Sequence, residues 1–430
     1  MPSIAPSSSS NPEQQVSRSK IYQLKNCRLV RDGKIVKDDF WFRDGQILNP
    51  EPVFFTEKAR ADVTVDCQDA LICPGFIDIQ LNGGYGYDFS SDPEHLEEGV
   101  AKVSKGILST GVTSFCPTVV TSSPELYHQV LPRLKPRPGG PEGAGILGVH
   151  LEGPFISMEK KGAHQPEFIR NSLQSVQDLS DVYGALDNVT MVTIAPELPG
   201  ALDAIAHLTN KWVTVSLGHS NGNLEDGEAA MNQGATFITH LFNAMLPFHH
   251  RDPGLVGLLT SRKVPHPVHY GIIADGIHTH PAALRIAHRT HPEGLVLVTD
   301  AMAAMGLSEG EHQIGQMKVN VSGQCARLVG SDTLAGSIVT MDHCVRQFIK
   351  DAGVSLVEAI EAATKHPALA IGHSHSKGSL NYGADADFLL LRDQGDSISI
   401  LHTFIAGECV YSAPTAPHLE YVHHHHTDKK

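Results

Sequence analysis

The chain of 430 residues is 41% hydrophobic and 19% charged, as in ordinary soluble globular proteins. Its formal net charge of -14 argues against a nucleic-acid or anionic membrane surface, although a local basic pocket for one phosphate stays open. Seven scattered cysteines without a CxxC pair argue against a disulfide framework and fit a reducing, cytoplasmic compartment. No apolar run approaches the roughly 20 residues that span a bilayer.

The two ends of the chain predict tails and a small β-domain. Residues 1–19 are rich in Ser, Pro and Gln, which predicts a disordered tail. Within 20–72, the turns Arg-Asp-Gly at 31–33 and 43–45 separate short apolar runs, which predicts β-hairpins. Strands at 387–391 and 397–405 would pair with them, so 20–72 plus 379–412 form one β-sandwich domain. Residues 413–430 are predicted to be a C-terminal tail, and the four histidines at 423–426 are excluded from the site.

Residues 73–378 repeat a short apolar run followed by a stretch long enough for a helix. The runs are continuous rather than alternating, which indicates strands buried on both faces of a parallel sheet. Helices are expected at 224–233 and 355–371. Eight such units predict a (β/α)8 barrel, with a doubly wound open sheet as the alternative. The eight runs are 76–81, 112–116, 146–151, 190–195, 213–217, 235–239, 269–274 and 295–299.

Ionisable and amide residues follow these runs, where a barrel places its functional groups. They are Gln80, Asn82, His150, Glu152, His219, His240, Asp275, His278 and Asp300. Two imidazoles and one carboxylate, His219, His240 and Glu152, suit zinc or a similar divalent ion with one position open to water. A lone histidine is more often a hydrogen-bonded core residue, but three strand ends that each deliver a ligand favour a metal site.

Asp300, after the last run, is the candidate general base that faces the metal site. Its alternative role is an ordinary helix N-cap. Two segments hint at an anionic substrate: the basic stretch 248–251, which includes Arg251, and the glycine-containing stretch 333–337. Each taken alone is more simply a solvated charge and a turn.

The motifs at these positions resemble the N-acetylglucosamine-6-phosphate deacetylase family of the amidohydrolase superfamily, from about residue 20 to about 412. Pro-Gly-Phe-Ile-Asp at 74–78 and Gly-Ala-Asp-Ala-Asp at 383–387 recur across the superfamily and are moderately specific. Gly-Val-Thr-Ser-Phe-Cys-Pro-Thr at 111–118 and Gly-His-Ser at 218–220 also match. The combination of His-Leu-Glu-Gly-Pro-Phe at 150–155 with Thr-His-Leu-Phe-Asn-Ala-Met at 239–245 is specific to the deacetylases.

The resemblance implies deacetylation of a sugar phosphate, with release of acetate, and a role for each matching residue. Glu152, His219 and His240 would hold one divalent ion, with zinc expected, and Asp300 would be the catalytic acid/base. His164 would stabilise the oxyanion as a second catalytic residue. The substrate-binding residues would be Ala163, His164, Asn243, Ala244, Arg251, Asp275, His278, Leu334, Ala335 and Gly336. A homodimer is implied, with Arg251 able to reach the neighbouring subunit's site.

One departure concerns the first strand, where many amidohydrolases carry a His-x-His pair that supports a second metal. Here the pair is Gln80 and Asn82, which are poor ligands for a transition metal, so one metal is expected. Two other functions stay open. One is a different amidohydrolase specificity, such as a dihydroorotase-like enzyme or an amino-acid deacylase. The other is a barrel without catalysis that serves as a scaffold.

Overall fold

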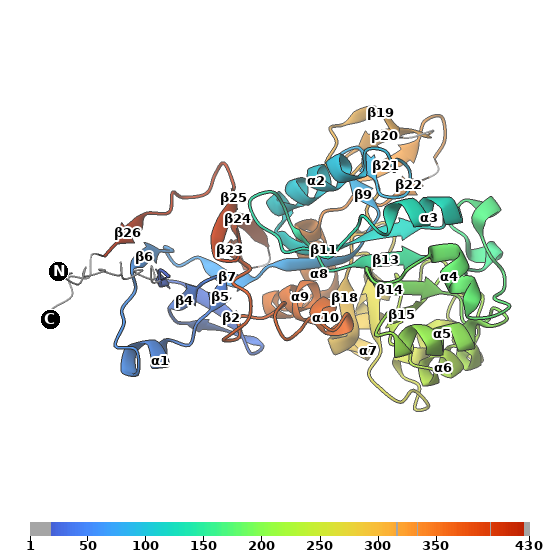
Figure 1. Cartoon of the computed structure of the whole chain (residues 1–430), viewed down its shortest axis with the longest axis horizontal. Helices are drawn as coiled ribbons and strands as arrows, with labels where there is room; N and C mark the ends of the chain where they lie inside the picture. Colours follow the sequence, from blue (N-terminus) through green and yellow to red (C-terminus); the bar gives the residue numbers. More distant parts are fainter. Residues whose placement is uncertain (1–18, 315–316, 333, 396, 425–430) are drawn as a thin grey trace, which may run out of the picture.

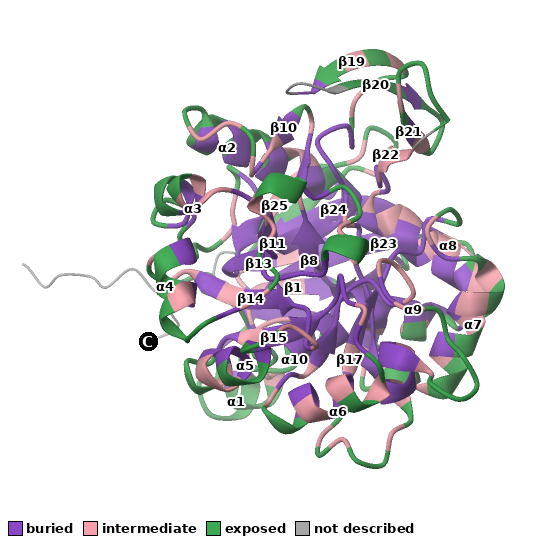
Figure 2. Cartoon of the chain, turned by 90° about the vertical axis from the view of Figure 1, so that its right-hand side faces the viewer, coloured by how far each residue is buried: buried purple, intermediate pink, exposed green. Residues whose placement is uncertain are grey.

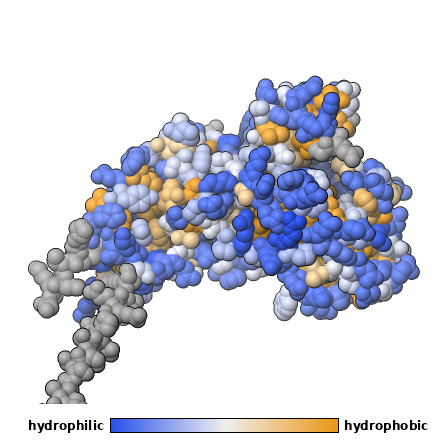
Figure 3. All heavy atoms as spheres, turned by 45° about the horizontal axis from the view of Figure 1, so that its top comes forward, coloured by the Kyte–Doolittle hydropathy of each residue, from blue (hydrophilic) through white to orange (hydrophobic). Residues whose placement is uncertain are grey.

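The computed structural model describes residues 19–314, 317–332, 334–395 and 397–424, which form a barrel and a β-sandwich that lie side by side (Figure 1). The predicted tail 1–19 lies outside the described residues except for Ser19. Among the described residues, no helix combines the length and apolar character needed to cross a membrane. The face drawn in Figure 3 is largely hydrophilic, with small apolar areas scattered over both the β-sandwich side and the barrel side.

Eight parallel strands form the barrel, and each pairs with the next along the chain. The ring is completed by a parallel bridge between Leu81 and Ala301 and by the hydrogen bond from Asp300 N to Gln80 O at 2.8 Å. The predicted barrel is therefore confirmed, and the open doubly wound sheet is wrong. The strands are β8 (Phe76–Leu81), β11 (Val112–Val120), β13 (Val149–Glu152), β14 (Val189–Ile194), β15 (Thr214–Leu217), β16 (Phe237–Ile238), β17 (His269–Ile272) and β18 (Leu295–Leu297).

The strands are buried along nearly their whole length, and the helices around them expose their outer faces (Figure 2). This is why the sequence shows continuous apolar runs in place of alternation. The helices that follow the barrel strands are α2 (Leu96–Gly106), α3 (Pro124–Val130), α4 (Gln177–Tyr183), α5 (Ala201–Asn210), α6 (Leu224–Asn232), α7 (Pro281–Thr290), α8 (Met341–Ala352), α9 (Leu356–Ala363) and α10 (Lys365–Ala370).

The helix expected at 224–233 is α6, which begins with a capping box between Asn223 and Asp226. The helix expected at 355–371 is instead two helices, α9 and α10, that meet at Thr364. Pro367 explains the break, because a proline ring inside a helix clashes with the carbonyl four residues before it. The third predicted strand is also divided, into β12 (Gly145–Ile146) and β13, with Gly148 between them in the left-handed region at φ 129°.

Two sheets from both ends of the chain form the β-sandwich. Their orders are β26-β6-β1-β4-β5 and β25-β24-β23-β7-β2-β3. Asp32 and Gly33 have φ 50° and 72°, which is the turn geometry that Asp-Gly favours in a two-residue hairpin. The strands are β1 (Tyr22–Lys25), β2 (Arg28–Arg31), β3 (Lys34–Lys37), β4 (Phe40–Arg43), β5 (Gln46–Ile47), β6 (Val63–Asp66), β7 (Leu71–Pro74), β23 (Phe388–Asp393), β24 (Ile398–Ile405), β25 (Glu408–Ser412) and β26 (Tyr421–His423), with helix α1 (Pro50–Phe55) between β5 and β6.

The structure differs from the tail predicted at 413–430, because β26 pairs antiparallel with β6. His424 continues this contact, with Nε2 3.1 Å from Thr64 Oγ1. Residues 425–430 lie outside the described residues.

Two small sheets at the barrel mouth were not predicted. A hairpin of β9 (Gly83–Gly84) and β10 (Tyr87–Asp88) follows β8. A four-stranded antiparallel sheet lies between β18 and α8 and contains β19 (Gly310–Ile314), β20 (Met317–Ser322), β21 (Cys325–Leu328) and β22 (Leu334–Gly336). After β22 the chain returns to the barrel, where Ser337 pairs with Ala301. This sheet therefore brings residues 334–336 close to the end of β18.

Candidate metal centre and active site

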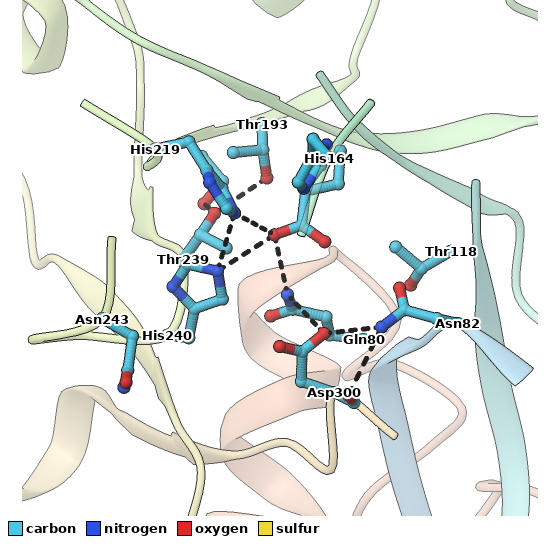
Figure 4. Close-up of polar contacts among 12 residues, drawn as sticks. Gln80, Asn82, Thr118, His164, Thr193, His219, Thr239, His240, Asn243 and Asp300 are labelled. Atoms are coloured by element: carbon cyan, nitrogen blue, oxygen red, sulfur yellow. Dashed lines mark hydrogen bonds and ion pairs between the residues drawn. The ribbon is translucent and has the colours of Figure 1, made fainter. Parts of the chain in front are cut away.

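Three side chains from three strand ends converge at the barrel mouth (Figure 4). Glu152 is the last residue of β13, and His219 and His240 each follow their strands by two residues. Glu152 Oε1 lies 3.1 Å from His219 Nε2 and 3.0 Å from His240 Nε2, and the two Nε2 atoms are 3.1 Å apart. All three residues are buried. The structure thus brings the three predicted metal ligands together at the barrel mouth.

This geometry fits a single divalent cation. Two atoms bound to one tetrahedral zinc at about 2.1 Å lie about 3.4 Å apart, which is close to the separations seen here. The Lys160 carbonyl lies 2.7 Å from His219 Nδ1 and can only accept, so Nδ1 carries the proton and Nε2 keeps its lone pair for a metal. His240 Nδ1 is buried and has no hydrogen-bond partner among the described residues.

His164 is a fourth member of the cluster, with its ring centroid 4.4 Å from that of His219. Ligand-type atoms of Glu152, His164 and His219 lie within 4.8 Å of one another, so distance alone would admit His164 as a ligand. The contacts favour His240 instead, because His240 Nε2 lies 3.0 Å from Glu152 Oε1. His164 Nδ1 is turned to Thr121, with Oγ1 at 2.7 Å and the backbone N at 3.4 Å. Burial lowers the pKa of His164 to about 3, which keeps this ring neutral.

Asp300 lies at the opposite side of the cluster, after β18, with φ 46°. His219 and His240 also have positive φ, 48° and 27°. Non-glycine residues rarely adopt this conformation, and such strain concentrates at functional sites. Burial, followed by the negative charge of Glu152, raises the pKa of Asp300 to about 6. A carboxyl group with this pKa can both accept and donate a proton near neutral pH.

The amides of Gln80 and Asn82 hold this carboxylate, a role that sequence reasoning missed. Gln80 Nε2 donates to Asp300 Oδ1 at 3.2 Å and to Glu152 Oε1 at 3.1 Å. Asn82 Nδ2 donates to Asp300 Oδ1 at 2.8 Å. Their place at the end of the first strand was the signal available in the sequence. His150, also a candidate, lies deeper, where its ring bonds to Ile79 O at 3.1 Å and Thr193 Oγ1 at 2.8 Å.

The predicted substrate-binding residues divide into two groups. Asn243 and Ala244 follow His240 in one turn, and Ala244 O accepts from Ser220 N at 3.1 Å, beside His219. Asp275 Oδ2 and His278 Nδ1 are 2.5 Å apart. Burial would lower the pKa of His278, but the bond and charge of Asp275, with a contribution from Asp300, raise it.

The remaining predicted residues lie at the rim. Leu334, Ala335 and Gly336 are the half-buried strand β22, and Ala163 is exposed beside His164. Arg251 is not brought to the cluster. It is exposed, and its Nε donates to His250 of its own loop at 3.2 Å.

The chain is similar to known deacetylases in both sequence and structure. An N-acetylglucosamine-6-phosphate deacetylase from Danio rerio is 57% identical over 400 residues, which cover 92% of this chain and 98% of the relative. One from Homo sapiens is 54% identical over 407 residues, covering 94% and 99%. A Mycobacterium smegmatis deacetylase, an alanine variant solved in complex with N-acetyl-D-glucosamine-6-phosphate, has a TM-score of 0.76 and 31% identity and covers 92% of this chain and 100% of its own. The amidohydrolase family model matches residues 71–410, and the chain therefore belongs to the amidohydrolase family.

Proposed function

We propose that the chain is a zinc-dependent deacetylase that hydrolyses N-acetyl-D-glucosamine 6-phosphate to D-glucosamine 6-phosphate and acetate. The observation that carries this proposal is the convergence of Glu152, His219 and His240 on one point opposite the buried Asp300. The relatives with this activity in their names match the chain over nearly their whole lengths, which supports the same substrate. The intact ligand set and these relatives count against a scaffold without catalysis.

The reaction cleaves an amide, which resists hydrolysis because the amine leaves poorly and hydroxide is scarce at neutral pH. A divalent cation held by Glu152, His219 and His240 would polarise the acetyl carbonyl and lower the pKa of water. Asp300 takes a proton from the attacking water and gives it to the amide nitrogen as the carbon–nitrogen bond breaks. In its Nε2–H tautomer, His164 would donate to the carbonyl oxygen as it gains negative charge. The products are acetate and the free amine.

The rate should depend on the protonation of Asp300. Its carboxyl group has a pKa raised to about 6, and the base form is lost as the pH falls through this value. We therefore expect kcat/KM to fall at acid pH with an apparent pKa no higher than about 6, because a bound cation favours the carboxylate. Initial rates between about pH 4 and pH 8 test this. If kcat/KM fell on the acid side with an apparent pKa well above 6, a group other than Asp300 would be responsible for the loss.

We infer that the sugar phosphate is held by residues beside the metal centre. Burial would lower the pKa of His278, but its bond to Asp275 raises it, which favours the charged form that can bind an anionic or hydroxyl group. Arg251 is exposed on a loop outside the cluster, which supports a contribution to the neighbouring subunit's site in a homodimer. Light scattering tests the assembly, and a monomer at assay concentration would contradict this contribution.

A substrate panel tests the proposed function. It contains N-acetylglucosamine 6-phosphate, the same sugar without phosphate, N-acetylgalactosamine 6-phosphate and N-acyl amino acids. We expect release of acetate from the first compound at the highest kcat/KM, because a phosphate held far from the reacting carbonyl orients the substrate. Preference for N-acyl amino acids would overturn the proposal and favour a different amidohydrolase specificity.

A further inference from the structure

The amide pair at the end of β8 is placed between the two acidic groups of the site. Gln80 is buried and lies inside the strand, and Asn82 is the residue after the strand's end. Gln80 Nε2 donates to one oxygen of Glu152 and to one oxygen of Asp300, so a single –NH2 group bridges the two carboxylates (Figure 4). Asn82 Nδ2 donates to the same Asp300 oxygen, Oδ1, and to the Asp300 carbonyl at 3.3 Å.

The hydrogen-bond pattern fixes which end of each amide faces the carboxylates. If either amide were turned over, its oxygen would face acceptor oxygens, and the contacts would become repulsive. Only a donor fits at these two positions. The bridge also matters electrostatically, because two buried carboxylates repel one another and a shared N–H donor offsets this repulsion.

These side chains are not needed to close the barrel. The backbone does this itself, through Asp300 N to Gln80 O at 2.8 Å and Asn82 N to Ala301 O at 2.9 Å. The amide groups act mainly on the carboxylates, and their one bond to the backbone here runs from Asn82 Nδ2 to the Asp300 carbonyl. Because Oδ1 of Asp300 accepts from both amides, Oδ2 is the oxygen left to exchange protons with the reacting groups.

We propose that Gln80 and Asn82 are positioning residues for the reaction. The Gln80 –NH2 group lies between the metal ligand Glu152 and the acid/base Asp300 and donates to both carboxylates. Because both amides donate to Asp300 Oδ1, they leave Oδ2 as the oxygen that reacts. This inference rests on the function proposed above. It also fits the expectation of one metal ion, because a neutral donor between the two carboxylates offsets their repulsion without a second cation.

The test uses the nearly isosteric variants Gln80→Glu and Asn82→Asp, which replace a donor by an acceptor. We expect kcat to fall by about 10- to 100-fold in both, with KM changed by less than about threefold, because the substrate contacts remain. Gln129→Glu, at an exposed position of α3, is the matched control and should behave as wild type. Wild-type kcat in both variants, or a rise in KM that accounts for the whole loss, would overturn the proposal.

A second readout does not depend on turnover. Gln80→Glu places a third carboxylate beside Glu152 and Asp300, so equilibrium dialysis should find two zinc ions per chain in place of one. In the described part of the chain the Asn82 side chain bonds to Asp300 and not to Glu152, so Asn82→Asp should still bind one zinc ion. If Gln80→Glu does not fold, Asn82→Asp still tests the selection of the Asp300 oxygen. A wild-type enzyme inactive on every sugar phosphate would contradict the proposed function. An unchanged number of bound zinc ions in folded Gln80→Glu would contradict the bridging role of Gln80.

Discussion

Asp300→Asn is expected to lower kcat by about 10²- to 10⁴-fold while the protein keeps its metal. An amide oxygen is too weak a base to take a proton from water, and an amide nitrogen cannot return one to the leaving amine. The side chain should stay in place, because an asparagine oxygen can still accept from Gln80 and Asn82 as Oδ1 does now. Turnover of N-acetylglucosamine 6-phosphate and metal content by mass spectrometry measure the two effects separately.

The control for this variant is Asp203→Asn, which removes an exposed carboxylate from α5. It should leave both kcat and metal content unchanged. If Asp300→Asn kept near-normal turnover, Asp300 would not be the acid/base. If it lost the metal together with activity, Asp300 would act as a ligand rather than as a proton carrier.

Glu152→Gln is expected to weaken zinc binding by more than about 100-fold, since even partners outside the ligand set commonly contribute 10- to 100-fold. The substitution removes the negative charge of Glu152, whose Oε1 contacts both His219 and His240. Activity at limiting zinc should therefore fall to the level of the metal-stripped protein. Zinc competition with a chromophoric chelator measures the affinity, and assays over a range of zinc concentrations show whether excess metal restores turnover.

Glu225→Gln, an exposed position of α6, is the control for loss of a carboxylate and should bind zinc normally. A Glu152→Gln protein that bound zinc as tightly as the wild type would contradict the assignment of Glu152. In that case His164 would be the next ligand to examine, because it lies in the same cluster.

The barrel and its candidate ligands were predictable from sequence for one physical reason. A strand buried on both faces is largely apolar, so a ligand-type residue at its end stands out, as Glu152 does after Val149 and Leu151. The barrel register then predicts that such residues meet at one mouth. His219 and His240 follow the same logic, and the structure brings all three within hydrogen-bond distance.

The features that were missed depend on contacts that no local pattern reveals. Gln80 reaches Asp300 across 220 positions of sequence, and only the closed ring brings them together. The sheet of β19–β22 was missed because its strands are short and partly exposed, as in β19, where exposed and half-buried residues alternate before Ile314. The pairing of β26 with β6 joins the two ends of the chain and has no signal near Tyr421.

The central claim is metal-dependent deacetylation of a phosphorylated sugar by the Glu152, His219 and His240 centre. The most direct test measures acetate release from N-acetylglucosamine 6-phosphate by protein that lacks residues 423–426, first stripped of metal and then restored with zinc. We predict no release by the stripped protein and full release after about one equivalent of zinc per chain. Release that persists in the stripped protein, or none after zinc is restored, would contradict the claim.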